Sequence, residues 1–554
     1  MKIFMFILRR INSFLCDLAL IYVLFYLCLF IRPIGFPISA YYFCTVILYF
    51  GLTYGLFRAS FMQKLSGIVI SKHRLNYLLF KLLWIAVIPL SLSVLHYDIF
   101  LILYVLIMLI LSIIVLTFTK KSLWQWCSGA QIELQTEPYT NTSHIIILLV
   151  VIMALIFFPL FRSNFRLNMA EFIQNNKKAA FPISIPEKAH YVKNIRQYKE
   201  EPVNYILQLF DKYDIVIFCE RLHPECTQWE FFSEIILNDT FASNVKNVFT
   251  EVGNTMEQER LDSYMNTHFS TEEDLQCATA AIARENAIWP IWSNTNIYDF
   301  ISQLHQFNET RDSLNRINLF FTDSTIDWDK IKNTVEYDIL THCNRDSMMA
   351  YHIINQYKTQ HLNKCLVITN TRHSWNYGKN QAAYIFKEFP DKTAVVLING
   401  TTQIMLPLMN GTLDAAAIEI PDSIWAIDFK NCSLGSTQFD LMPSVKQNKR
   451  TYKNLFVGMV YCKHPGNWIL SNNYPFILDN YQETLLGRSA LLGEKYLKQI
   501  KERIEKGSFD RIDRRKSPIF ALTNLSFIII HSIILLFLFL NLFVKFLLLL
   551  FRKK

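Results

Sequence analysis

Long apolar segments near both ends of the sequence restrict the possible folds more than any other feature. The sequence carries these segments near 13–31, 39–57, 77–96, 99–118, 144–161 and 518–550. Each of the first five is close to the length that an α-helix needs to cross the hydrocarbon core of a bilayer, and the last is a longer apolar stretch. We therefore predict five transmembrane helices in residues 1–161 and a sixth at 518–550, with the lipid bilayer as a partner of the chain.

Basic residues indicate how these helices are oriented. Lys and Arg mark the N-terminus, the loops at 58–76 and 119–143, and the closing residues 552–554, whereas the opposite side has almost none. Because cytoplasmic loops carry the excess of Lys and Arg, we expect a multi-pass protein of the cell (inner) membrane with both termini cytoplasmic. The region between the fifth and sixth helices is then extracytoplasmic, or periplasmic. The formal charge of +9 is modest and no basic stripe crosses this region, so no nucleic-acid partner is expected.

The central stretch DIVIFCERLHPECTQW, residues 214–229, is typical of the first half of a βαβ unit. The apolar, β-branched run at 215–218 predicts a strand buried on both faces. Glu220 and His223 follow in a loop, and a Thr-x-x-Glu capping box at 227–230 predicts the start of a helix. Because the loops after the strands of open parallel sheets hold the ligand, Glu220 and His223 are candidate site residues.

Further strand-like runs repeat this pattern. Their positions are 245–250, 317–322, 365–369 and 393–398. A titratable residue follows each of the first three runs, namely Glu251, Asp323 and His373. Because parallel strands point their carboxyl ends to one edge of a sheet, these side chains are predicted to converge with the first loop on one crevice.

The strand repeat also predicts the fold class. Residues 204–510 are expected to form an α/β domain with a mostly parallel sheet flanked by helices, after a polar connector at 162–203. The 11 cysteines are scattered without a CxxC pair, which argues against a disulfide framework and against a zinc-ribbon site.

Six short motifs follow one another in this region. They are CERLH at 219–223, FTEVGN at 249–254, a tryptophan-rich stretch ending at Asn308, a strand ending at Asp323, RDSMMA at 345–350 and ITNTRH at 368–373. In this order they resemble the erythromycin-esterase-like family and its wider superfamily, which also holds the Tiki/TraB proteases and the ChaN-type haem-uptake lipoproteins. The resemblance covers about 204–470, since FDLMPSVKQN and YKNLFVGMVYC are similar to the closing strands of the family.

Two positions depart from the pattern of that family. Its first motif has Gly before the Glu, whereas this chain has Cys219, and Cys adopts positive φ less readily than Gly. The second histidine often found near the last motif is absent, and Asn376 stands three residues after His373. Neither departure disturbs the predicted fold.

The motif residues form a set that can activate water. An imidazole near neutral pKa accepts a proton from water, and a neighbouring carboxylate orients it, which are roles for His223 and Glu220. Glu251 and His373 could act on the leaving group, and Arg345 could stabilise a developing oxyanion. The set contains no Ser or Cys in a nucleophile elbow, so direct attack by water is the simpler hypothesis.

Substrate and cofactor contacts are predicted from the same motifs. The residues predicted to bind the substrate are Asp323, Asn254 and Asn370. A divalent metal, which the resemblance to Tiki proteases implies, could be held by Glu220, His223, Glu251 and His373. The resemblance to ChaN makes haem the alternative cofactor.

Three functions are compatible with the sequence. The first is a membrane-anchored, extracytoplasmic hydrolase that cleaves an ester or amide bond of an unknown envelope substrate. The second is a haem-, metal- or ligand-binding envelope protein, or an inactive scaffold. The third is a phosphoethanolamine-type transferase, whose layout also places an α/β domain after five membrane spans. That class needs a Thr nucleophile and an Asp-His metal motif, whereas the strand at 365–369 leads into Asn-Thr-Arg-His.

Overall fold

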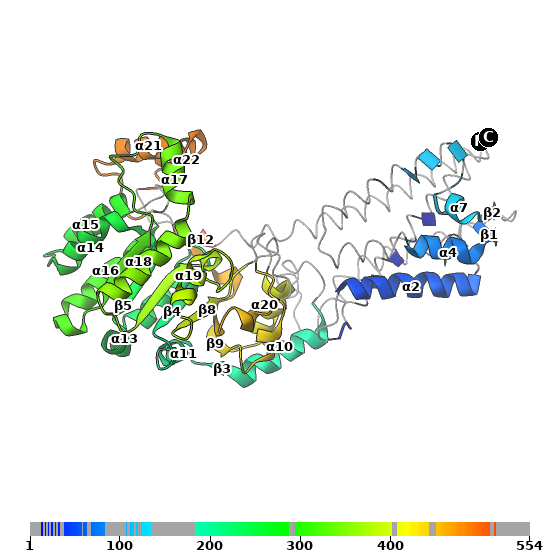
Figure 1. Cartoon of the computed structure of the whole chain (residues 1–554), viewed down its shortest axis with the longest axis horizontal. Coiled ribbons are helices and arrows are strands. Elements are labelled where there is room, and N and C mark those ends of the chain that lie inside the picture. The colour runs from blue at the N-terminus through cyan, green and yellow to red at the C-terminus, as the bar shows by residue number, and fades with distance from the viewer. Residues whose placement is uncertain are drawn as a thin grey trace. The chain divides into compact units, whose positions relative to one another are not determined.

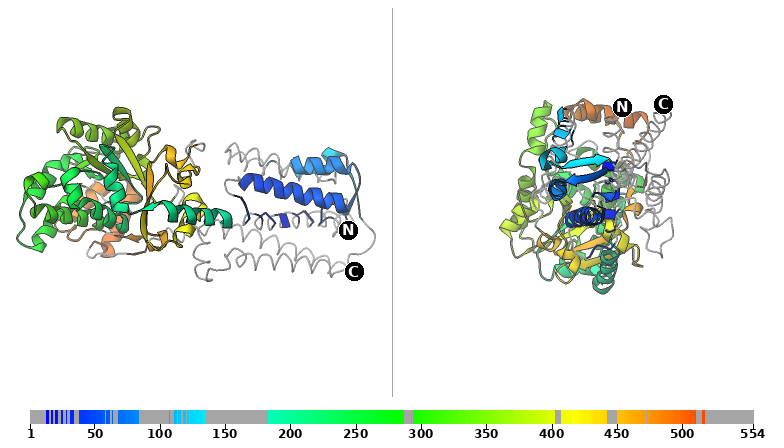
Figure 2. Two further views of the ribbon diagram at one scale, coloured as in Figure 1. Left: turned by 90° about the horizontal axis from the view of Figure 1, so that it is seen from below. Right: turned by 90° about the vertical axis from the view of Figure 1, so that its right-hand side faces the viewer.

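A computed structural model of the chain describes most of the central region and parts of the N-terminal region (Figures 1 and 2). The described residues are 183–509 apart from 287–291, 293, 402–406, 442–449 and 472, together with 38–57, most of 59–83, 123–134, 515–516 and scattered positions in 13–33 and 107–121. The chain divides into two compact units. One contains residues 1–190, 410–412 and 523–554, and the other contains 191–409 and 413–522.

In the first unit, one apolar helix matches the second predicted membrane segment. α2 (Ile38–Phe57) contains the one stretch, Ala40–Phe57, that is long and apolar enough to cross a membrane among the residues the structure describes. A core helix of a soluble protein meets the same criteria. The other predicted segments lie wholly or mostly outside the described residues, so the six-helix membrane region stays a prediction. The remaining described elements are α4 (Arg74–Leu82), α7 (Leu123–Ser128) and an antiparallel pair, β1 (Ile68–Lys72) with β2 (Gln131–Leu134).

The second unit is built on an eight-stranded sheet with the order β3-β9-β10-β8-β4-β7-β5-β6. The strands are β3 (Lys199–Glu200), β4 (Ile215–Glu220), β5 (Asn247–Asn254), β6 (Asn318–Asp323), β7 (Cys365–Asn370), β8 (Thr393–Ile398), β9 (Ile424–Asp428) and β10 (Gly458–Cys462). All neighbours from β10 to β6 are parallel, and β9 runs antiparallel to both β10 and β3. The predicted mostly parallel sheet is confirmed, and each of the five predicted strands is present.

Helices pack against this sheet. The helices from residue 185 to residue 505 are α10 (Ile185–Tyr198), α11 (Pro202–Leu209), α12 (Cys226–Ile236), α13 (Asp239–Asn244), α14 (Gln258–Asn266), α15 (Glu272–Asn286), α16 (Thr295–Glu309), α17 (Thr334–His342), α18 (Arg345–Thr359), α19 (Gln381–Glu388), α20 (Thr412–Ala417), α21 (Gln482–Leu491) and α22 (Glu494–Glu505). Figure 1 shows α17, α21 and α22 grouped at one side of the sheet and helix layers. A short antiparallel pair, β11 (Ile469–Leu470) with β12 (Arg515–Lys516), follows β10. α10 and β3 lie within the predicted connector at 162–203, and the compact unit that holds the sheet includes residues from Tyr191 onward.

The strand β4 lies in the middle of the parallel sheet, and all six of its residues are buried. A strand with parallel neighbours on both sides has helices against both faces, which is why its sequence is apolar without alternation. The Phe218 ring packs edge-on against Phe231 and Phe232 of α12, with centroids 6.0 and 5.0 Å apart. This packing fixes the end of β4 relative to α12, which follows the loop at 221–225.

The predicted capping box at 227–230 is wrong. The N-cap residue of α12 is Glu225, whose carboxylate accepts hydrogen bonds from the backbone N–H groups of Thr227 and Gln228 at 2.9 and 3.1 Å. A carboxylate at this position also interacts favourably with the helix dipole. Glu225 outcompetes Thr227 because its side chain reaches both amides of the first turn.

Candidate active site

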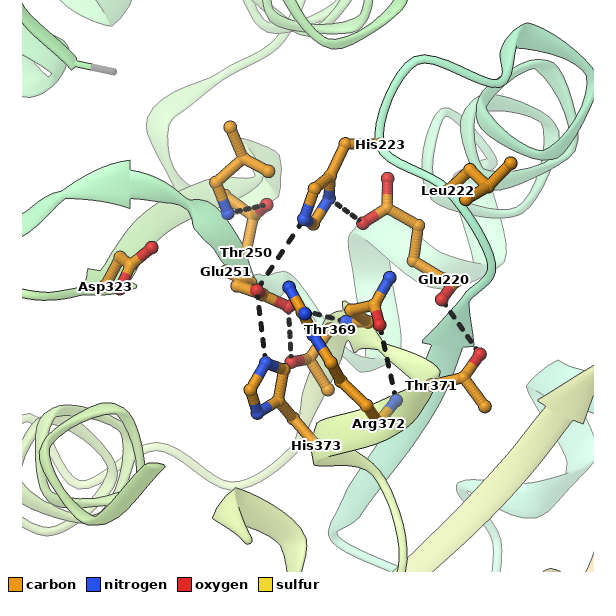
Figure 3. A network of polar contacts seen from close by, with 12 residues as sticks. Glu220, Leu222, His223, Thr250, Glu251, Asp323, Thr369, Thr371, Arg372 and His373 are labelled. Atoms are coloured by element: carbon orange, nitrogen blue, oxygen red, sulfur yellow. Dashed lines mark hydrogen bonds and ion pairs between the residues drawn. The ribbon is translucent and has the colours of Figure 1, made fainter. Parts of the chain in front are cut away.

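The carboxyl ends of four adjacent strands bring the predicted catalytic residues together (Figure 3). Glu220 ends β4 opposite Asn370 of β7, and Glu251 lies on β5, next to a register irregularity between Thr250 and Asn254. Two further segments complete the site, since Arg345 is the first residue of α18 and His373 ends the 3-10 turn η4 (Thr371–His373). In Figure 3, His223 and His373 flank Glu251 on two sides.

His223 and Glu220 form a buried pair. Nδ1 of His223 lies 2.5 Å from Oε2 of Glu220, whose other oxygen accepts a hydrogen bond from Nε1 of Trp229 at 2.7 Å. An ionised carboxylate only accepts hydrogen bonds, so it places the proton of the imidazole on Nδ1. The second ring nitrogen, Nε2, is buried without a hydrogen-bond partner and lies 3.7 Å from Oε1 of Glu251. The imidazole therefore presents a free acceptor to the interior of the site.

The surroundings of His223 hold its ring and tune its basicity. The Trp292 ring packs against it with centroids 4.3 Å apart, and Nδ2 of Asn296 donates to its backbone carbonyl at 2.7 Å. Burial alone would lower the pKa of His223, but the charge and hydrogen bond of Glu220, supported by Glu251, raise this pKa above its ordinary value.

A second histidine–carboxylate pair lies on the other side of Glu251. Nδ1 of His373 is 2.7 Å from Oδ1 of Asp346, which also accepts a hydrogen bond from the backbone N–H of Gln381 at 2.8 Å. Nε2 of His373 lies 3.6 Å from Oε1 of Glu251. The two imidazoles thus direct the same nitrogen at the same carboxylate oxygen.

Glu251 is the centre of the arrangement. One of its oxygens accepts hydrogen bonds from the Thr369 hydroxyl at 3.0 Å and from the backbone N–H of Asn370 at 2.6 Å. Burial alone would raise the pKa of Glu251, but attraction to His373 and Arg345 outweighs burial and lowers this pKa well below its usual value. Glu251 is therefore an anion over the whole physiological pH range.

Arg345 binds two carboxylates at once. Its Nε and Nη2 contact the two oxygens of Asp323 at 2.7 and 2.6 Å, and Nη2 also contacts Oε1 of Glu251 at 2.9 Å. Burial opposes its charge, but Asp323 and Glu251 raise the pKa of Arg345 above its usual value. Only Nη1 remains directed elsewhere, 3.5 Å from Nε2 of His373. Arg345 mainly fixes the carboxylates, and little of it is available for the predicted oxyanion contact.

The three residues predicted to bind the substrate have different surroundings. Asp323 is fully buried, and both of its carboxylate oxygens accept hydrogen bonds from Arg345. Asn254 is also fully buried, and its side chain bonds both backbone groups of Ile326 at 2.7 and 2.9 Å, so it fixes the loop after β6. Asn370 is partly exposed at the rim, where its Nδ2 donates to the carbonyl of Arg221 at 3.3 Å. Asn370 is the one of the three that is not fully buried.

Asp346 and Arg221 contribute to the site but were not predicted from the sequence. Asp346 follows Arg345 directly, and its position in the first turn of α18 was the available signal. Arg221 occupies a variable position of CERLH, yet its buried guanidinium bonds Glu225 at 2.7 Å and Oδ1 of Asn399 at 2.9 Å. It lies 4.3 Å above the Trp468 ring. Arg221 thereby connects the loop at 221–225 to the ends of β8 and β10 through hydrogen bonds.

Cys219 fits its position without strain. It pairs with Thr369 in the parallel ladder of β4 and β7 and is not among the residues with positive φ. The backbone at this position is extended, so the glycine of the family motif is not required here. Burial raises the pKa of the Cys219 thiol to about 12, which excludes a thiolate nucleophile at neutral pH.

Comparisons with known proteins find only distant structural similarity. No family model and no curated protein matches the chain. Among solved structures it is similar to a Bacillus cereus protein, with 10% identity and a TM-score of 0.36 over 50% of this chain and 97% of that one. A succinoglycan biosynthesis protein gives 10% identity and a TM-score of 0.37 over the same shares. ChaN of Campylobacter jejuni, described with cofacial haem, gives 13% identity and a TM-score of 0.22 over 35% and 85%. At these scores, function has to be argued from the site itself.

The site does not fit a divalent metal. The oxygen of Glu251 that both imidazoles approach is already bound by the Arg345 guanidinium, and a second cation there would be repelled. Within the described part of the chain, no group of three or more His, Cys, Asp or Glu side chains is arranged to hold a metal ion. Haem, the alternative cofactor, stays a prediction, because the contacts of the described residues do not test it.

Proposed function

We propose that this chain is a membrane-anchored hydrolase of ester or amide bonds in the cell envelope. The observation that carries the proposal is the buried Glu220–His223 pair with its free Nε2 directed into the site. A histidine held by a carboxylate at Nδ1 is a general base for a proton near Nε2. The apolar ends of the sequence support membrane anchoring, with the α/β domain outside the cytoplasm.

The proposed reaction uses water as the nucleophile. Nε2 of His223 takes a proton from water while the water oxygen attacks the carbonyl carbon of the substrate. The tetrahedral intermediate then collapses, and the imidazolium returns the proton to the departing alcohol or amine, so the base is regenerated. In the proposed reaction Glu220 stabilises the imidazolium and His373 contacts the leaving group; their contacts to His223 and Glu251 support these roles.

Neighbouring hydroxyl and thiol groups do not compete as nucleophiles. The Thr369 hydroxyl donates to Glu251, and the Thr371 hydroxyl donates to the carbonyl of Glu220 at 2.9 Å. The Ser374 hydroxyl donates to the carbonyl of Asn370 at 2.8 Å. Each hydroxyl already donates its hydrogen atom to a carboxylate or a backbone carbonyl, and none is hydrogen-bonded to His223, so the proposal does not use them as nucleophiles.

Chelation provides a direct test of the proposed chemistry. The full-length protein in neutral detergent is expected to hydrolyse p-nitrophenyl esters at a rate that EDTA leaves unchanged, because Arg345 fills the position that a metal would need. Release of p-nitrophenol measures the rate. Complete absence of hydrolysis across an ester and anilide panel would contradict the proposal. Loss in EDTA with recovery in Zn²⁺ would contradict the metal-free mechanism.

The pH dependence of turnover is a second prediction. The base works only when Nε2 is unprotonated, so activity falls as pH falls through the pKa of His223. Because Glu220 and Glu251 raise that pKa, the half-maximal point is expected above the ordinary value of 6.5. A kcat/KM profile of the full-length protein between pH 5 and 9 measures it, and a half-maximal point at or below 6.5 would contradict the assignment.

A further inference from the structure

Arg372 lies within the site on a turn that is fixed on both sides. It is the middle residue of η4, between the end of β7 and His373. Its backbone N–H donates to Oδ1 of Asn370 at 3.3 Å, and the neighbouring Thr371 hydroxyl donates to the carbonyl of Glu220 at 2.9 Å. The backbone around Arg372 is therefore held by the carboxyl ends of β4 and β7.

No ion pair neutralises the charge of Arg372 among the residues that the structure describes. Arg345 and Arg221 each bind buried carboxylates, as described above. Arg372 is exposed, and it forms no ion pair with any residue in the described part of the chain. It is thus an arginine of the site whose guanidinium donors remain available to a ligand.

The side chain of Arg372 reaches toward the catalytic groups. In Figure 3 it extends from η4 toward Glu251 and His223 rather than away from the site. The charge of Arg372 also acts on His223: it lowers the pKa of the imidazole, whereas the charge of Glu220 raises it. Arg372 is therefore an exposed cation whose charge acts on the buried base.

A guanidinium has a specific chemical preference. Its planar fork of N–H donors matches the two oxygens of a carboxylate or phosphate, and such charge-assisted pairs are stronger than neutral hydrogen bonds. The fixed turn lowers the entropic cost of presenting this fork, because the backbone is already ordered.

We propose that Arg372 binds an anionic group of the substrate, a carboxylate or a phosphate, next to the bond that His223 hydrolyses. The preferred substrates are then anionic esters or amides. This inference rests on the proposed function for its reaction, but the anion site itself is independent of turnover.

Two esters with the same leaving group test the preference. Mono-p-nitrophenyl succinate carries a carboxylate, and p-nitrophenyl butyrate is neutral. For the full-length protein in neutral detergent at low salt, the ratio of kcat/KM for the anionic ester to that for the neutral ester is expected to fall about tenfold in Arg372→Gln, and less in Arg372→Lys. Arg260→Gln, which changes an exposed arginine on α14, should leave the ratio unchanged. On the neutral ester, Arg372→Gln should also shift the acid limb of the pH profile upward, because a cation beside His223 is removed.

Binding measurements separate this inference from the proposed function. Inorganic phosphate and succinate, titrated calorimetrically, show which anion the site takes, and binding should be lost in Arg372→Gln. Anion binding without any ester hydrolysis would leave the site standing and overturn the hydrolase. Hydrolysis with an unchanged ratio in Arg372→Gln, or an equal loss on both esters, would overturn the anion site and leave the hydrolase standing.

Discussion

Replacing His223 by alanine is expected to lower ester turnover by about a thousandfold, because the replacement removes the general base and leaves only substrate positioning. The fold should survive, since the imidazole makes a single side-chain hydrogen bond, to Glu220, and packs on the surface of Trp292. Initial rates of p-nitrophenyl ester hydrolysis measure the loss. Circular dichroism and the thermal midpoint of the same sample establish that the variant is folded.

Glu220→Gln provides the matched test of the pair. The amide keeps the size of the side chain, and its oxygen can still accept from Trp229, but it cannot stabilise an imidazolium. Turnover is expected to fall about a hundredfold or more. His268→Ala removes the histidine of an exposed His–Glu pair with Glu309 in the same unit and should leave the rate unchanged. Wild-type rates in both Glu220→Gln and His223→Ala would refute the assigned base.

Arg345→Met is expected to destabilise the α/β unit by about 3–5 kcal/mol, because it leaves two buried carboxylates without their cation. Asp323 and Glu251 are essentially inaccessible to solvent, so water cannot replace the lost contacts. For a unit of this size the loss corresponds to a thermal midpoint lower by about 5–8 °C. Differential scanning calorimetry of the full-length protein measures the shift.

The pH dependence of that destabilisation separates charge from packing. The folded-state pKa of Glu251 is depressed, so its contribution to stability is present above its unfolded pKa of about 4.3 and is lost as pH falls through the folded value. The difference between wild type and Arg345→Met should therefore be full at pH 8 and shrink in acid. Arg260→Met, which breaks an exposed pair with Glu257, should cost about 1 kcal/mol or less. An equal loss of stability in Arg345→Met and Arg260→Met would mean that the buried ion pairs of Arg345 stabilise the unit no more than an exposed ion pair does.

Strand positions were readable from the sequence because burial on both faces leaves a continuous apolar run. Ile215–Glu220 and Thr393–Ile398 are buried throughout, and each was visible as such a run. Convergence of Glu220, Glu251 and His373 then followed from parallel topology alone. The α/β fold and the grouping of the candidate catalytic residues were predictable for this reason.

The partner of each polar group was not predictable in the same way. Arg345 was expected to face a substrate, but two carboxylates from β5 and β6 reach it first. Glu225, rather than Thr227, caps α12, because a longer side chain reaches both amides. Such outcomes depend on distances of a few ångströms between segments far apart in the chain, and a single sequence carries no signal for them. Periodicity locates strands; it does not assign hydrogen-bond partners.

The short strand β11 and the residue after it are hydrogen-bonded to the loop at 221–225, which carries His223. Ile469 donates its backbone N–H to the carboxylate of Glu225 at 3.3 Å, and Ser471 donates to the carbonyl of Pro224 at 2.8 Å, although these pairs are 244 and 247 positions apart in the chain. On its other side β11 pairs with β12, and the sequence continues from β12 into the apolar stretch 518–550. The position of the loop that carries His223 therefore depends on two short hydrogen-bonded strands, one of which comes from the end of the α/β unit.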